Sequence, residues 1–399
     1  MPNISESPIT VEELVSRASA LVPLLQERHQ SVDEKRCIPA ESVNELSAAG
    51  MYSLSAPREY GGYALPMADY VDVMAELSKG CSSTAWVAAI ANSTSYLVGI
   101  CSQRAQDEVF AGGANRPLAS VPQAKMSTAR FADGGVHIEH ARWFFNSGVT
   151  LSDWVINGVV VSDDDGTPLD LVMCLIPTSE LTLHDDWFTI GMRGTQSVST
   201  EARDVFVPNY RAVSSLAVLG GMYKPIYGLD QPLYHSAAVP ALSMFVAPCG
   251  IGIAEAALDR FVCKAQGRAV TYTTIENQAD DSLVHGSVGE ARLKIDSARA
   301  LLKTTAANID SWARRGEMMP IHERIRARAA CSYGLTLCWE AVDRLYSLSG
   351  GSVINEFEPM QRYWRDMKTA TMHGLLTPSS ALTLQGRIDL HREPNAVFV

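Results

Sequence analysis

The sequence predicts an α+β protein built in three consecutive parts, with helices first, β-strands second and helices again at the end. Apolar residues recur at helical spacing up to a glycine pair at 112–113, and short β-rich runs bounded by turn residues then fill residues 118–207. Amphipathic helical runs return after about residue 222. We therefore place an N-terminal helical domain at residues 1–115, a central β-domain at 116–222 and a C-terminal helical bundle at 223–399.

The N-terminal part carries the start and stop signals of helices. A capping box at Thr10 opens an amphipathic run that we expect to continue through Leu25. Two further helical runs follow, at 66–77 and 82–100. The second of these is so rich in Ala and Val that we expect it to be buried on all sides.

The central part is typical of strands separated by turns. Residues 136–140 alternate between apolar and polar side chains directly after an Asp-Gly-Gly turn at 133–135, which indicates a hairpin. Further strands are expected at 154–161, 169–176 and 197–207.

The C-terminal part contains three long helical runs and a fourth that begins near Gln361. The pair Gly250 and Gly252 superficially resembles a dinucleotide-binding loop, but no βαβ pattern surrounds it, and a helix start explains it better. Arg324, Arg326 and Arg328 are most simply a solvated helix face, with a subunit interface as the alternative.

Composition and charge exclude several classes of function. The 399 residues hold 33 Lys and Arg against 44 Asp and Glu, and this net charge of −11 disfavours nucleic-acid binding and a basic membrane-surface protein. Eight cysteines without Cys-x-x-Cys spacing predict reduced thiols and a cytoplasmic protein. Residues 1–7 lack the regions of a signal peptide, and the apolar stretches look too short or too interrupted to cross a membrane. His137 and His140 would point to opposite faces of a strand, so we expect no metal site.

Motifs along nearly the whole chain resemble those of the acyl-CoA dehydrogenase fold. In order, they are Pro-Arg-Glu-Tyr-Gly-Gly at 57–62, Ser-Ser-Thr-Ala-Trp at 82–86, Gly-Met-Arg-Gly-Thr at 191–195, Ser-Gly-Gly at 349–351 and Arg-Tyr-Trp-Arg-Asp at 362–366. The resemblance implies an N-terminal helical domain, a central β-barrel domain and a C-terminal four-helix bundle. It also implies a homotetramer.

The oxygenase branch of this fold matches better than the dehydrogenases. Dehydrogenases carry a catalytic Glu after the Arg-Asp element, whereas this chain has Thr-Met-His-Gly at 371–374, and no acid stands at the alternative position near 265–268. Residues 143–148, Trp-Phe-Phe-Asn-Ser-Gly, followed by Trp154, resemble the signature of the group D, reduced-flavin-dependent two-component monooxygenases. Phenol, steroid-catechol and polyketide hydroxylases and aminosugar N-oxygenases are similar. A histidine common in the early helical domain of that family is missing from 91–94.

This resemblance implies the oxygenase component of a two-component hydroxylase. It would use reduced FAD or FMN and O2, through a C4a-hydroperoxyflavin, on a phenolic, indolic or polyketide-like small molecule in secondary metabolism or aromatic catabolism. A separate NAD(P)H:flavin reductase is implied, because the chain shows no nicotinamide-binding unit. The implied catalytic residues are Ser147, which would accept a hydrogen bond from flavin N5–H, and His373, which would act as the substrate base. The other implied cofactor contacts are Trp143, Phe145, Asn146, Arg268 (toward the phosphate, often in a neighbouring subunit), Gly350 and Gly351, and the expected substrate-pocket residues are Trp86, Asn92, Tyr234 and His235.

Three alternatives stay open on the sequence alone. The same flavin chemistry could oxygenate the nitrogen of an amino sugar. An acyl-CoA dehydrogenase with an unconventional base is a second reading, and a flavin-free scaffold or non-redox enzyme on this fold is a third.

Overall fold

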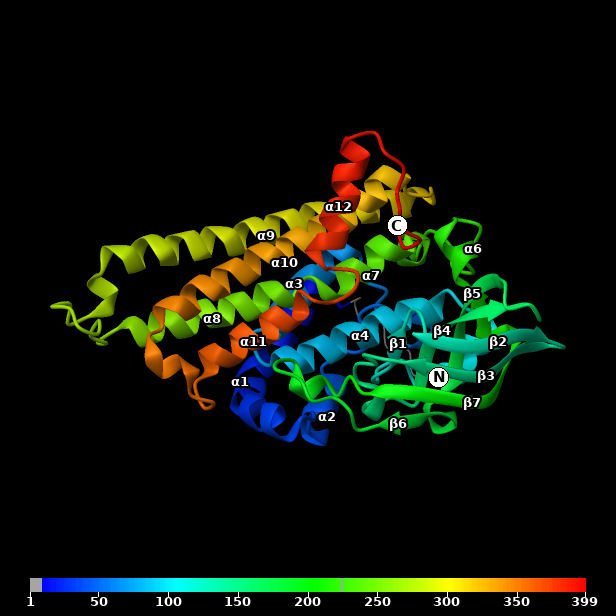
Figure 1. The fold of residues 1–399 in the computed structure, drawn as a ribbon, viewed down its shortest axis with the longest axis horizontal. Coiled ribbons are helices and arrows are strands. Elements are labelled where there is room, and N and C mark those ends of the chain that lie inside the picture. Colours follow the sequence, from blue (N-terminus) through cyan, green and yellow to red (C-terminus); the bar gives the residue numbers. More distant parts are fainter. Residues whose placement is uncertain (1–8, 224) are drawn as a thin grey trace.

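The computed structural model describes residues 9–223 and 225–399. Residues 1–7, on which the expected absence of a signal peptide depends, lie outside this described part. The β-strands gather at one end of the molecule, and the long helices α8 (Cys249–Ala265), α9 (Ser282–Arg315) and α10 (Ile321–Leu348) extend side by side toward the other end (Figure 1). The predicted α+β architecture is confirmed.

The N-terminal helices begin where their caps predict, although the first one is longer than expected. Helix α1 (Val11–Lys35) starts after Thr10, whose hydroxyl accepts the Glu13 N–H at 3.2 Å. It continues past the predicted end at Leu25, because buried side chains such as Val32 extend its apolar face. Every residue of α4 (Ser82–Gly99) is buried, as predicted. The remaining helices of this part are α2 (Ala40–Ala48), α3 (Met67–Leu77) and α5 (Gln103–Val109).

The strands form two four-stranded sheets that enclose a hydrophobic core of their own. The first sheet has the order β1-β4-β5-β8 and the second has the order β2-β3-β7-β6. The predicted turn joins β2 and β3, so that Ala132 pairs with Gly135. The strands are β1 (Ala119–Val121), β2 (Met126–Ala132), β3 (Gly135–Trp143), β4 (Trp154–Ser162), β5 (Pro168–Pro177), β6 (Thr182–His184), β7 (Ser199–Pro208) and β8 (Ala212–Ser214).

The C-terminal helices pack against the N-terminal ones. The remaining members are α6 (Ser215–Leu219), α7 (Ala238–Val246), α11 (Pro359–Ala370) and α12 (Pro378–Asp389). Helix α8 approaches α3 so closely that a Cβ on Gly252 would stand 2.1 Å from the Ala75 carbonyl oxygen, which explains the glycine at this helix start.

One apolar stretch is longer than the sequence suggested. Residues 238–265 form a helical stretch long and apolar enough to cross a membrane, contrary to our expectation that all such stretches are too short or interrupted. Its most apolar window is 94% buried inside the fold, so it has the position of a core helix.

Candidate active site

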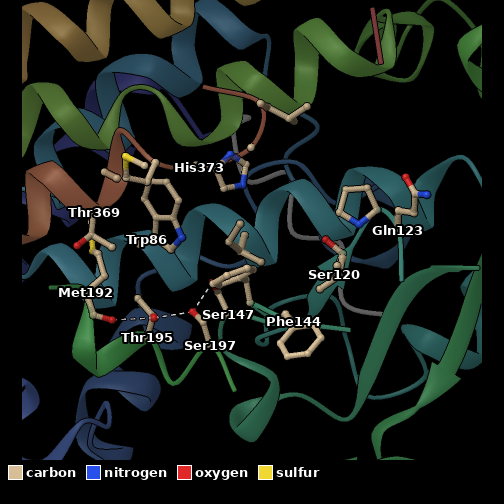
Figure 2. A pocket seen from close by; sticks show the side chains of 18 of the residues that line it. Trp86, Ser120, Gln123, Phe144, Ser147, Met192, Thr195, Ser197, Thr369 and His373 are labelled. Atoms are coloured by element: carbon tan, nitrogen blue, oxygen red, sulfur yellow. Dashed lines mark hydrogen bonds between the residues drawn. The ribbon is translucent and has the colours of Figure 1, made fainter. Parts of the chain in front are cut away.

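A pocket of about 530 Å³ lies where the β-domain meets the helices (Figure 2). Its wall comes from α4, from the end of β1 and the turn after it, from segments 144–147 and 187–197, and from the end of α11 and the chain after it, with single residues from α10 and from the C-terminal segment. Aromatic side chains make much of this wall, and its polar groups are hydroxyls, one imidazole, one guanidinium and one side-chain amide. Within the described part of the chain, no Asp or Glu lines it.

The segment after β3 gives the pocket two aromatic rings. Trp143, the last residue of the strand, points into the core between the sheets, is fully buried and donates its indole N–H to the Gly158 carbonyl at 2.8 Å. The expectation that Trp143 walls the pocket therefore does not match its position, because the alternation of side chains along β3 turns it inward. Phe144 and Phe145 line the pocket instead. Phe145 has a left-handed φ of 66°, and its ring meets Trp187 edge-on with the centroids 5.9 Å apart.

Asn146 supports this segment from behind. Its side chain is fully buried and is not part of the pocket wall. The amide donates to the Thr200 hydroxyl at 3.1 Å, which ties the segment to β7. A direct contact between Asn146 and a molecule in the pocket therefore does not fit this position.

Ser147 begins a chain of hydroxyls along the pocket wall (Figure 2). Its Oγ lies 2.7 Å from Oγ of Ser197, which lies 2.6 Å from Oγ1 of Thr195. Thr195 donates in turn to the Met192 carbonyl at 2.8 Å. The Gly148 N–H donates to the Thr195 carbonyl at 2.9 Å and holds the two segments together. Sequence reasoning missed Thr195 and Ser197 as site residues, although the motif at 191–195 and its next residues contain them.

His373 lies in the chain that follows α11 and faces the pocket. Its ring packs edge-on against Trp86, with the centroids 5.5 Å apart, and Nδ1 is buried with no hydrogen-bond partner among the described residues. Burial, together with the positive charge of Arg328, lowers the pKa of His373 to about 4. The imidazole is therefore neutral near pH 7 and able to accept a proton.

Arg328 corrects the sequence interpretation of a solvated arginine face. It is buried and lines the pocket, whereas Arg326 is exposed. The Arg328 guanidinium donates to the carbonyls of Leu375 at 2.9 Å and Phe398 at 2.7 Å, so it joins the His373 loop to the chain near residue 398. Arg326 and Arg328 are two residues apart on the helix, so their side chains point in different directions. The sequence pattern alone does not show which of them faces the interior.

Of the four expected substrate-pocket residues, only Trp86 lines the pocket. The other three hold the helical part together and lie outside the wall. Their side chains meet backbone carbonyls: Asn92 that of Met51 at 2.8 Å, Tyr234 that of Ser55 at 2.8 Å and His235 that of Tyr227 at 3.0 Å.

Arg268, Gly350 and Gly351 form a second location, away from the pocket. Arg268 lies in the loop between α8 and α9, at the end of the molecule opposite the strands (Figure 1). Its guanidinium packs on Gly350, where a Cβ would stand 2.1 Å from Nη2 and where φ is 66°. None of the three lines the pocket of the same chain.

Comparison with known proteins agrees with this architecture along the chain. The acyl-CoA dehydrogenase N-terminal domain model matches residues 17–111, and the acyl-CoA dehydrogenase C-terminal domain model matches residues 244–378. The structure of XiaF from Streptomyces sp., in complex with FADH2 and glycerol, is similar with a TM-score of 0.89 and 29% identity over 97% of both chains.

Curated relatives extend over almost the full length. The oxygenase subunit HsaA of a flavin-dependent monooxygenase from Rhodococcus jostii (strain RHA1) is 29% identical, covering 93% of this chain and 97% of that protein. The oxygenase component of an FADH(2)-dependent resorcinol hydroxylase from Rhizobium sp. (strain MTP-10005) is 25% identical, covering 96% of each. The two domain matches together cover more than half of the chain and place it in the acyl-CoA dehydrogenase family, and the relatives to which it is similar over almost its full length are oxygenase components of flavin-dependent monooxygenases.

Proposed function

We propose that this enzyme hydroxylates a small aromatic molecule, phenolic, indolic or polyketide-like, with reduced flavin and O2. The observation that carries the proposal is the pocket itself. It places the neutral imidazole of His373 and the hydroxyl chain of Ser147 in one mainly apolar enclosure that contains several aromatic rings. The substrate named for the resorcinol hydroxylase supports a phenolic ring.

The residues present fit a flavin. Phe145 keeps an exposed ring on a left-handed backbone at the pocket edge, a combination that a flat ligand would cover and that an unliganded surface does not explain. Phe145 and Trp187 would hold the flavin ring, and Ser147 would accept a hydrogen bond from it. The FADH2 named for XiaF and for the resorcinol hydroxylase supports FAD over FMN. When bound, reduced flavin supplies the two electrons with which one atom of O2 enters the substrate and the other leaves as water.

The residues of the chain then have distinct tasks. The aromatic wall keeps water away from the reacting atoms, which limits wasteful release of H2O2. His373 takes the proton of the substrate hydroxyl and so raises the electron density of the ring that is hydroxylated. Arg328 keeps this base in place through the loop that follows α11.

The pocket does not favour the alternatives. A dehydrogenase of this fold removes the proton alpha to a thioester with a carboxylate, and the described lining residues include none. An amino sugar carries hydroxyl and amino groups around its whole edge, and the described wall offers them few polar partners. The flavin-dependent relatives, similar over almost the whole chain, disfavour a flavin-free scaffold.

We also propose a cytoplasmic homotetramer that receives reduced flavin from a separate NAD(P)H:flavin reductase. Two-component relatives support the reductase. The distance of the Arg268 loop from the strands supports the tetramer, because Arg268 would then serve the pocket of a neighbouring subunit (Figure 1). Ile354 and Phe357, exposed apolar side chains just beyond Gly350, suit such an interface. The eight unbridged cysteines support a reducing compartment.

The test combines the purified protein with a flavin reductase, NADH, FAD and panels of phenols, indoles, polyketide-like aromatics, amino sugars and acyl-CoA esters under isotopically labelled O2. We expect a hydroxylated aromatic that carries labelled oxygen. Product from the amino sugars or dehydrogenation of the acyl-CoA esters would contradict the proposal. Release of H2O2 alone with every aromatic class would contradict it as well.

A further inference from the structure

We infer that a one-way chain of hydrogen bonds fixes Ser147 as an acceptor toward the pocket, with Ser197 and Thr195 as the positioning residues that set this direction. The inference rests on the proposed function, because it concerns how Ser147 meets a reduced flavin. It goes further by giving a defined task to two hydroxyls behind Ser147. That task is to select the oxidation state of the flavin.

The direction follows from counting protons. Each hydroxyl has one proton to donate, and a carbonyl oxygen has none. Thr195 lies 2.8 Å from the Met192 carbonyl oxygen and must donate to it, so toward Ser197 it can only accept. Ser197, 2.6 Å away, therefore donates to Thr195, and toward Ser147 it can only accept. Ser147, at 2.7 Å, spends its own proton on Ser197.

What Ser147 then offers to the pocket is lone pairs alone. The three hydroxyl-bearing residues are all buried, with exposed fractions of 7% for Ser147, 4% for Ser197 and 1% for Thr195, so water competes little for these bonds. Reduced flavin carries a proton on N5, whereas oxidised flavin has a lone pair there. As an acceptor, Ser147 forms a hydrogen bond with the N5–H of reduced flavin. Against oxidised flavin, its lone pair would meet the lone pair of N5, and no hydrogen bond forms.

The far end of the chain is anchored to α11. The Met192 N–H donates to Oδ1 of Asp366 at 2.6 Å, and Asp366 is only 1% exposed. Burial opposes ionisation of this carboxyl, but the neighbouring His29 and the Met192 N–H outweigh burial and lower the pKa of Asp366. A charged acceptor therefore holds the Met192 peptide and with it the carbonyl that ends the chain.

The turn that presents this carbonyl is strained and needs such an anchor. Met192 and Gln196 both have left-handed φ values, of 52° and 42°, on either side of the short helix at Arg193–Thr195. Non-glycine residues adopt this conformation only where their surroundings impose it. The Trp187 indole N–H adds a second bond to the Met192 carbonyl at 3.1 Å.

The test measures flavin affinity rather than turnover. Dissociation constants of oxidised and reduced FAD are determined by anaerobic titration, and their ratio gives the preference for the reduced form. In Ser197→Ala the Ser147 hydroxyl becomes free to donate to oxidised N5, so we expect the preference to fall by about tenfold, the value of one neutral hydrogen bond. Thr195→Val should act in the same direction, whereas Thr195→Ser, which keeps the hydroxyl, should preserve the preference.

Two further variants separate the chain from general damage. Adding Ser197→Ala to Ser147→Ala should change the preference no further, because Ser197 acts only through Ser147. Thr189→Val removes a hydroxyl that bonds Gly191 in the same loop outside the chain, and it should leave the ratio unchanged. Equal weakening of both oxidation states by Ser197→Ala, or an additive double variant, would overturn the inference. Failure of the proposed function is distinguishable, since the wild-type ratio could then persist without any aromatic hydroxylation.

Discussion

At the residue scale, the environment of His373 sets the pH range in which this residue could act as the proposed base. An ordinary histidine would be half protonated near pH 6.5, whereas burial and Arg328 lower the pKa of His373 to about 4. The neutral form, which is the form that could act as the proposed base, is therefore present above that value and lost only as pH falls through it. We expect the fraction of reduced flavin coupled to hydroxylation to stay level between about pH 5 and pH 7. Single-turnover product yields with preloaded reduced flavin measure this fraction.

His373→Gln is the matched variant for this prediction. It should lower the hydroxylation rate by about 10²- to 10⁴-fold, the usual contribution of a positioned base, while reduced flavin continues to react and release H2O2. The prediction would be contradicted if the coupled fraction of the wild type fell as pH drops through about 6.5 and this fall were absent from the variant. His373 would then titrate like an ordinary histidine.

Sequence reasoning located part of the site, and the residues show why it stopped there. Ser147, Phe145, Trp86 and His373 line the pocket, and their motifs had singled them out. Their chemical roles stay predictions. Trp143 stood in the same motif, but the alternation of β3 turns it into the core. Whether residue 143 or residue 144 is the first to face the pocket depends on where the strand ends, which the sequence alone does not fix to one residue.

Other site residues gave no signal that could be read locally. Arg328 belonged to a charged pattern that usually marks solvent, and only the fold shows that its own chain covers it. Asn92, Tyr234 and His235 are polar groups satisfied by backbone carbonyls, which sequence cannot distinguish from groups facing a ligand.

At the element scale, the segment after β3 depends on a glycine. Gly148 has a φ of +75°, and a Cβ there would stand 2.7 Å from Cγ1 of Val87 on α4. Gly148→Ala therefore costs about 1–2 kcal/mol for the left-handed backbone and about 1–3 kcal/mol for the overpacking. We expect a lower melting temperature and, because Ser147 moves with the segment, more H2O2 per reduced flavin.

Gly166 supplies the control for that prediction. It has a nearly equal φ of +81°, with nothing within 4 Å of the added Cβ. Gly166→Ala should show only the backbone part of the destabilisation and normal coupling. If both variants lost the same stability and both kept normal coupling, the contact of Gly148 with α4 would have no part in holding the site.

At the scale of the whole molecule, the order of helices and strands followed from periodicity, and packing decided the rest. Helix α1 extends beyond its predicted end because residues such as Val32 are buried in the tertiary fold. Residues 238–265 look like a membrane span by length and composition, yet neighbouring helices bury them. The spacing of apolar residues identifies the buried face of a helix or strand. It does not identify the surface against which that face packs.

At the scale of the assembly, Arg268 lies outside the pocket of its own chain. If Arg268 serves the pocket of a neighbouring subunit, then Arg268→Ala and Ser147→Ala damage different parts of a shared site. Each variant alone should couple poorly, whereas co-expression should restore activity, because about one site in four then combines an intact Ser147 with an intact Arg268 when chains mix at random. Product per reduced flavin, measured on mixed oligomers purified through two affinity tags, gives the answer. If mixed oligomers form but activity does not recover, Arg268 does not act on the pocket of a neighbouring subunit. If light scattering shows a monomer, a site shared between subunits is excluded.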